Sequence, residues 1–229
     1  MLKTFEQIIK SNALAIQKVV DFDVTTDRLL PLDFTATNTE LTDEILGNTD
    51  SFSDWVNQKL VDNASRYGIG GYNENRTIYA RSTHFDSDEE PRRLHLGVDI
   101  WGPAGTPIYS FYDATVHSFA NNNNFGDYGA TIILAYEIEG FKFNALYGHL
   151  NLASLNNLEE GKFIPAGTQI AEFGKKEENG YWPPHLHFQI IKNLQGLKGD
   201  YPGVCKFSER EKYLANCPDP NLILNCSLG

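Results

Sequence analysis

Residues 131–150 read TIILAYEIEGFKFNALYGHL, and this stretch decides which fold the chain can adopt. Two runs rich in β-branched and aromatic residues, 131–136 and 141–147, flank the pair Glu139-Gly140. Runs of this kind are typical of strands, and a short connection containing glycine is typical of a hairpin turn. The stretch therefore predicts two antiparallel strands joined by a tight turn.

Further short runs of the same kind lie on both sides of this hairpin. They cover 77–80, 107–111, 114–116, 168–171 and 187–191, with turns rich in glycine or asparagine between them. Several short strands at close intervals predict an antiparallel, mainly β domain.

The first third of the chain carries a helical pattern instead. Apolar residues recur every three or four positions from Phe5 to Val20, and Thr4 precedes them as a candidate N-cap. A second stripe of this kind runs from Phe52 to Leu60. Apolar residues at this spacing form the buried face of an amphipathic helix, so we expect both helices to pack on the β domain.

The pattern divides the chain into three parts. We expect a helical N-terminal extension over 1–66, a β domain over 67–200 and a tail over 201–229. Within the tail, 208–211 reads SERE, the pattern of a capping box, and predicts a short helix that stops at Pro218.

Composition restricts the class of protein further. With 41% hydrophobic residues among 229, the chain can build a packed core, which excludes a disordered protein. The net charge of −11 makes nucleic acids and anionic membranes poor partners. No apolar run approaches the roughly 18 residues of a membrane span. The three cysteines (Cys205, Cys217 and Cys226) match no metal or redox spacing, so we expect buried thiols. The oligomeric state is left open.

The first twenty residues bear on location. Charged residues interrupt every apolar stretch there, and no cleavage site of small residues follows. This pattern differs from a secretory signal and predicts a cytoplasmic protein. If Met1 replaces a removed signal, a periplasmic or secreted protein is expected instead.

The histidines form two arrangements, HLGVD at 95–99 and HLH at 185–187. In a strand, the two histidines of the second motif point to one face, about 6.5 Å apart. The ends of the first motif would lie about 13 Å apart in a straight strand, too far for one ion, so the chain must bend, most easily at Gly97. His84 and His117 lie outside both motifs, and no role is assigned to them.

Two histidines and one aspartate form a donor set that suits Zn²⁺ with one open position. A zinc ion of this kind lowers the pKa of a bound water to about 7, which is how hydrolytic zinc sites generate a nucleophile. The general base of a His-Glu-x-x-His motif does not occur in the sequence. A histidine that is not a ligand can replace it, and the candidates are His149 and one member of the His185/His187 pair.

These residues give the chain a resemblance to the lysostaphin-type zinc metallopeptidases, which cut peptide cross-bridges or stem peptides of bacterial cell walls. The order and spacing of the matching segments agree over roughly residues 65–192. The matching segments are HLGVDI at 95–100, GTPI at 105–108, DATV at 113–116, YGA at 128–130, YGHL at 147–150, PAGTQI at 165–170 and HLHF at 185–188.

The resemblance implies a fold, a site and a substrate. The fold is the antiparallel sheet core of these peptidases, a duplicated hybrid motif, here with helical additions at both ends. His95, Asp99 and His187 are the implied ligands of one zinc ion. His149 and His185 are implied to line the site, to polarise the attacking water and to stabilise the oxyanion. The implied substrate is a small peptide containing glycine or D-alanine, such as a muropeptide or a peptidoglycan cross-bridge.

Two other functions compete with this interpretation. A non-haem iron oxygenase also uses two histidines and a carboxylate, but its common motif is His-x-Asp, whereas three residues separate His95 from Asp99. A non-catalytic binding module could keep the peptidase fold, although such modules typically lose metal ligands and this chain has all the candidates. The metal content of the purified protein distinguishes the module from the enzyme.

Overall fold

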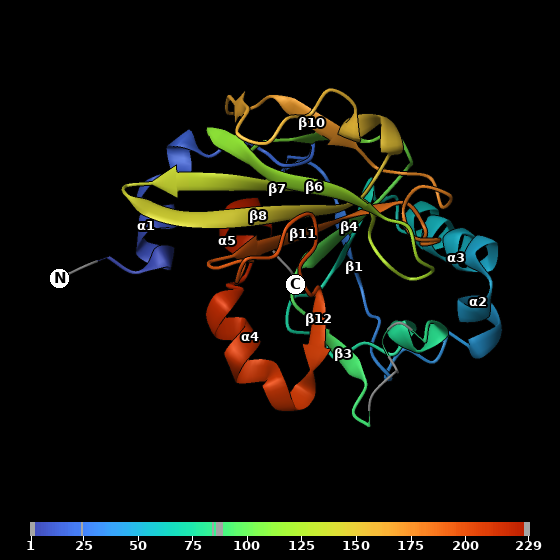
Figure 1. Ribbon diagram of the computed structural model, residues 1–229. Coiled ribbons are helices and arrows are strands. Elements are labelled where there is room, and N and C mark those ends of the chain that lie inside the picture. Colours follow the sequence, from blue (N-terminus) through green and yellow to red (C-terminus); the bar gives the residue numbers. More distant parts are fainter. Residues whose placement is uncertain (1–2, 24, 84, 86–88, 227–229) are drawn as a thin grey trace.

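The computed structural model describes residues 3–226 except 24, 84 and 86–88, and it has a mainly β fold, as the sequence predicts (Figure 1). The strands are β1 (Leu29–Leu32), β2 (Tyr67–Gly70), β3 (Arg92–His95), β4 (Val98–Trp101), β5 (Pro107–Tyr109), β6 (Ala114–Asn122), β7 (Gly129–Ile138), β8 (Phe141–Leu150), β9 (Phe163–Ile164), β10 (Gln169–Glu172), β11 (His185–Ile191) and β12 (Val204–Lys206). The α-helices are α1 (Phe5–Ser11), α2 (Asp43–Gly47), α3 (Thr49–Asp62), α4 (Arg210–Asn216) and α5 (Asn221–Leu224).

A large sheet organises the molecule. Its strand order is β1-β2-β4-β11-β8-β7-β6-β9, and all its pairs are antiparallel except β1 with β2. Two smaller antiparallel sheets, β10-β5 and β12-β3, lie on either side of it (Figure 1). Strands β4, β11 and β8 are neighbours near its middle, and the candidate site is built on them.

The hairpin expected from residues 131–150 is present. Strands β7 and β8 pair from Ile138↔Phe141 outward, with Glu139 and Gly140 forming the connection. Both connecting residues have positive φ, 50° and 78°, which a type I′ turn requires. The local sequence thus determines both the turn and the register of the two longest strands.

The two faces of the sheet bury different cores. Side chains alternate along a strand, so Ile132 and Leu134 of β7 enter one cluster with residues of α1, α5 and β11, whereas Ile133 enters another. The second cluster includes residues of β3 and β12, and residues of α4 pack against it. These three elements lie on one side of the large sheet (Figure 1). On β11, Leu186 and Phe188 belong to the first cluster, which leaves the two histidines of that strand on the second face.

Helix α3 confirms the helix expected over 52–60. Phe52 and Val56 are buried in a third cluster that also holds Trp101 of β4 and Trp182. Asn48 caps the helix by accepting hydrogen bonds from the first-turn amides at Asp50 and Ser51, 2.9 and 3.1 Å long. The helix therefore packs against the end of β4 near the candidate site.

The prediction of a helix from Phe5 to Val20 is wrong beyond the first two turns. Thr4 does cap it, but α1 ends at Ser11 because Asn12 turns its side chain back to the Ile8 carbonyl at 2.9 Å. Val20 instead forms an isolated bridge with Ile108 and is buried in the main core. The apolar spacing thus reflects burial in an extended segment, a case in which tertiary pairing overrides the helical period.

Two further expectations differ from the structure. The run at 77–80 is a 3₁₀ turn at Ile78–Arg81, closed by the Ala80 amide on the Thr77 carbonyl, because no strand pairs with it. The region 1–66 is not helical throughout, since β1 lies within it and extends the sheet in parallel with β2. The boundary expected at residue 66 stays a prediction.

The tail has the short helix that was expected, but not its capping box. Helix α4 begins at Arg210 without a side-chain cap, because the Ser208 hydroxyl donates to the Glu90 carboxylate at 2.5 Å instead. The three cysteines are free and buried, as expected. No helix in the described residues has the length and apolar character that a membrane crossing requires.

Candidate metal centre

Two of the three predicted metal ligands face each other across neighbouring strands. Asp99 on β4 is the register partner of His187 on β11. On their outer sides lie two glycines, Gly70 opposite Asp99 and Gly148 opposite His187. The site therefore stands on a row of four strands, in which glycine flanks the ligand side chains.

His95 reaches the same point because the chain bends, as the sequence predicts. Strand β3 ends at His95 and β4 begins at Val98, so Leu96 and Gly97 form the bend. A Cβ at Gly97 would lie 2.6 Å from Cε1 of His187 and 2.8 Å from the Phe188 carbonyl. Glycine is required at position 97 because the imidazole of His187 packs directly on the backbone that follows His95.

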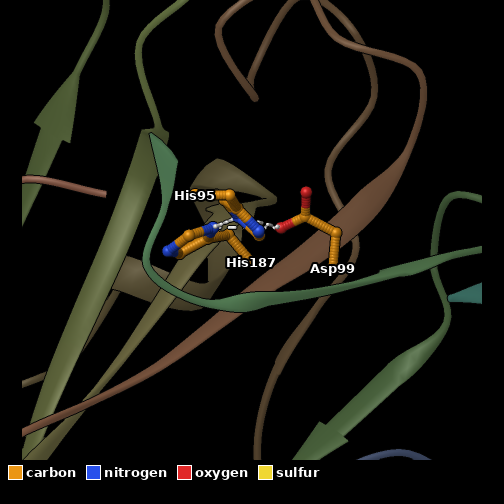
Figure 2. Close-up of side chains that lie close together, drawn as sticks. All are labelled: His95, Asp99 and His187. Carbon is orange, nitrogen blue, oxygen red and sulfur yellow. Dashed lines mark hydrogen bonds and ion pairs between the residues drawn. The ribbon is translucent and has the colours of Figure 1, made fainter. Parts of the chain in front are cut away.

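The three candidate ligand atoms form a nearly regular triangle (Figure 2). Nε2 of His95 lies 3.0 Å from Nδ1 of His187 and 3.2 Å from Oδ1 of Asp99, and the last two atoms are 3.0 Å apart. Bonds of about 2.0–2.2 Å to a tetrahedral zinc ion place its ligands about 3.4 Å apart. The donor set and its spacing fit a zinc ion after movements of a few tenths of an ångström.

The other nitrogen of each ligand histidine is already engaged. Nδ1 of His95 lies 2.9 Å from the Gly71 carbonyl, and Nε2 of His187 lies 2.9 Å from Oε1 of Gln189. The Gln189 amide nitrogen donates to the Pro202 carbonyl at 3.1 Å, which fixes its oxygen toward His187. We assign the N–H groups to these contacts, so each remaining lone pair faces the metal position.

Asp99 is a buried carboxylate with cationic support. Its second oxygen, Oδ2, accepts a hydrogen bond from Nη1 of Arg76, whose guanidinium is fully buried. Burial by itself would raise the pKa of Asp99, but His95 and Arg76 hold it well below its usual range. The carboxylate is therefore ionised, as a metal ligand must be.

The two remaining histidines lie beside the ligand set. His149 and His185 face each other with ring centroids 4.1 Å apart, and His149 is 6.3 Å from His187 by the same measure. Their Nδ1 atoms contact the carbonyls of Asn179 at 2.7 Å and Pro183 at 2.8 Å. Each ring thus donates through Nδ1 and keeps Nε2 as an acceptor.

Burial keeps both of these rings neutral. It lowers the pKa of His185 to about 4 and that of His149 well below the ordinary value for histidine. The Trp101 ring stacks on the His185 ring with the centroids 3.9 Å apart, which fixes the plane of the imidazole. Near pH 7 the site therefore offers two neutral imidazoles that can accept a proton.

A cavity of about 150 Å³ opens onto this group. Asp99, His149, His185 and His187 line it, whereas His95 does not. Aromatic residues from several parts of the chain form much of the remaining wall: Tyr79, Phe85, Trp101, Tyr128, Trp182 and Tyr201. The charged residues Arg92, Asp127 and Asp200 also line it. The cavity thus gives access from the surface to Asp99 and to three of the four histidines of this group.

His117, to which the sequence analysis assigns no role, lies outside the site. His117 on β6 contacts Ser118 at 2.8 Å, away from the cavity, and His84 is not among the described residues. The sequence did not point to Arg76 or the Gly71 carbonyl. Gln189 could have been found, because it follows His185 and His187 at every second position on one face of β11.

The bend gives a first prediction. Gly97→Ala should displace the His187 ring, weaken metal binding and lower the free energy of unfolding by about 1–3 kcal/mol, as other insertions into packed sites do. Chelator competition and urea unfolding measure the two effects. Gly47→Ala is the matched control, since a Cβ there meets nothing within 4 Å. Equal zinc affinity in Gly97→Ala and wild type would contradict the close packing of His187.

The buried histidines give a second prediction, for the metal-free protein. Burial lowers the pKa of His95 and of His185 to about 4. Between pH 6.5 and 4 the unfolded chain therefore binds protons that the folded chain does not, and the free energy of unfolding falls as the pH falls. The loss is at most about 3 kcal/mol per histidine. Urea unfolding at pH 7, 6 and 5 with a chelator measures it. A stability independent of pH would show that these rings are not buried in neutral form.

The comparison with known families confirms the resemblance. Residues 93–198 match the model of Peptidase family M23. The matched segment contains all five candidate site residues, from His95 to His187. None of the curated proteins matches the chain.

Several solved structures of peptidases are similar to this chain. A candidate M23 peptidase from Pseudomonas aeruginosa is 18% identical, with 58% of this chain and 44% of that one covered and a TM-score of 0.37. A zinc-containing peptidase from Vibrio cholerae is 27% identical over 43% of this chain and 27% of that one, with a TM-score of 0.34. The catalytic domain of lysostaphin from Staphylococcus simulans is 23% identical over 76% of this chain and 97% of that one, with a TM-score of 0.44. The chain thus spans less than half the length of the first two proteins.

Proposed function

We propose that this chain, whose residues 93–198 match Peptidase family M23, is a zinc-dependent endopeptidase that cuts peptides of the peptidoglycan type. The observation that carries the proposal is the triangle of His95, Asp99 and His187, with sides of 3.0–3.2 Å, beside two neutral histidines in one cavity. The donor set fits zinc with one position left for water or substrate.

Zinc bound there would supply a Lewis acid that polarises a carbonyl and makes water a nucleophile near neutral pH. The protein's own groups then manage the protons. His149 and His185 have Nδ1 committed to backbone carbonyls, so protons are gained and lost at Nε2. A neutral ring accepts a proton from the attacking water, and a protonated ring stabilises the oxyanion or donates to the leaving amine.

The cavity favours a small substrate segment. Its volume of about 150 Å³ lies below the 300–1,000 Å³ typical of pockets for drug-sized ligands. We therefore propose that the residues beside the scissile bond are small, as glycine and D-alanine are. The aromatic residues of the wall would supply apolar contact to such a segment.

The test combines metal analysis with substrate assays. Purified protein should carry close to one zinc per chain, and it should cut muropeptides or simple glycine- and alanine-containing peptides in a chelator-sensitive reaction. A protein with little metal and no hydrolysis would instead fit the non-catalytic binding module. The cytoplasmic location expected from the first twenty residues stays a prediction, which fractionation of cells making the native protein tests.

A further inference from the structure

A buried arginine contacts the candidate metal ligand Asp99. We propose that Arg76 is a positioning residue that holds Asp99 as a single-oxygen ligand and so keeps the fourth metal position open. The inference rests on the proposed zinc site. Arg76 precedes the segment matched by the family model, and its side chain is fully buried.

The two oxygens of Asp99 have separate partners. Oδ1 faces the ligand histidines, 3.2 Å from Nε2 of His95 and 3.0 Å from Nδ1 of His187. Oδ2 accepts from Nη1 of Arg76. A carboxylate whose second oxygen is bound in this way can give a metal one oxygen but not both, which preserves a four-coordinate site.

Other contacts prevent Arg76 from moving away. Nε donates to the Glu74 carboxylate at 2.6 Å, and Nη2 donates to the Gly71 carbonyl at 3.3 Å. The same carbonyl accepts from Nδ1 of His95. Arg76 therefore connects the orientation of Asp99 to that of His95. Only a planar guanidinium, with several N–H donors, can make these contacts together.

The guanidinium of Arg76 fits beside the sheet because Gly70 has no side chain. Gly70 is the register partner of Asp99, and a Cβ there would lie 2.6 Å from Nη2 of Arg76. On another side, the Phe34 ring centroid lies 5.2 Å from the guanidinium carbon. Arg76 thus occupies a closed space between β2 and the site, which suits a residue that fixes geometry.

The experiment measures zinc affinity and coordination of the purified full chain. In Arg76→Met, Oδ2 of Asp99 is free to join the metal. We expect zinc to bind about 10–100-fold more weakly by chelator competition, the usual effect of losing such a partner. With Co²⁺ in place of zinc, we expect the visible absorption to lose intensity, because added ligands weaken the bands of a four-coordinate ion. Arg76→Lys should recover part of both effects.

Two further variants control the interpretation. Arg81→Met removes another arginine from an aromatic environment, 4.9 Å from the Trp182 ring, and should leave zinc affinity unchanged. Gly70→Ala keeps the charge of Arg76 but displaces its end, and should weaken zinc binding as Arg76→Met does. If Arg76→Met does not fold, Gly70→Ala still tests the proposal.

The outcomes separate the two proposals. A wild-type protein that binds no zinc overturns the proposed function, and the positioning role of Arg76 with it. A wild-type protein that binds zinc, with unchanged affinity and cobalt spectrum in the folded Arg76 and Gly70 variants, overturns the positioning role alone. Weaker binding and a weaker spectrum in these variants, but not in Arg81→Met, support it even if the natural substrate is not a peptide.

Discussion

His187→Ala is expected to lose most of its zinc and all measurable peptide hydrolysis. Its Nδ1 lies within 3.0 Å of both other ligand atoms, and its removal leaves two protein ligands where a catalytic zinc site needs three. Metal analysis of the purified variant and a peptide assay with added zinc measure the effect. The same losses are expected for the alanine variants of His95 and Asp99.

The matched control is His117→Ala, because it removes a histidine from β6 outside the cavity. It should retain zinc and activity. A fully metallated His187→Ala protein would refute the ligand assignment. Loss of zinc from His117→Ala would show that metal content reports general damage and not the site.

His149→Ala and His185→Ala should behave differently from the ligand variants. Both should retain zinc, since neither ring belongs to the triangle of donor atoms. Each should lose about 10²–10⁴-fold in rate, the usual contribution of a proton-transferring or oxyanion-stabilising group. The two lie 4.1 Å apart by ring centroids, so their effects should not add in the double variant.

The measurement is kcat/KM at fixed zinc, with metal content determined on the same samples. Purification of either variant without metal would place that histidine among the ligands. A rate equal to wild type would remove it from the mechanism. Rate loss with full zinc occupancy is the result that the geometry of the cavity predicts.

Local sequence predicted the parts of this structure that depend on neighbouring residues. The β7–β8 hairpin follows from Glu139 and Gly140, and the bend between His95 and Asp99 follows from the distance that a straight strand would impose. The position of His185 and His187 on the same face of β11 follows from strand alternation. The family resemblance then supplied the assignment of His95, Asp99 and His187 as the ligand set, which spacing alone leaves open.

The contacts that sequence did not predict join distant residues or use the backbone. Arg76 and Asp99 are 23 positions apart, and nothing near Arg76 distinguishes a buried arginine from a surface one. The Gly71 carbonyl that orients His95 carries no side-chain signal at all. Likewise, the apolar spacing from Phe5 to Val20 resembles a helix, yet Val20 is buried through its bridge to Ile108.

Titration of metal-free protein with zinc, followed by peptide hydrolysis, tests the central claim most directly. The account predicts no activity without metal, a linear rise in rate up to one zinc per chain, and no such rise in His187→Ala. Hydrolysis that persists in excess chelator, or that does not change as zinc is added, would contradict it.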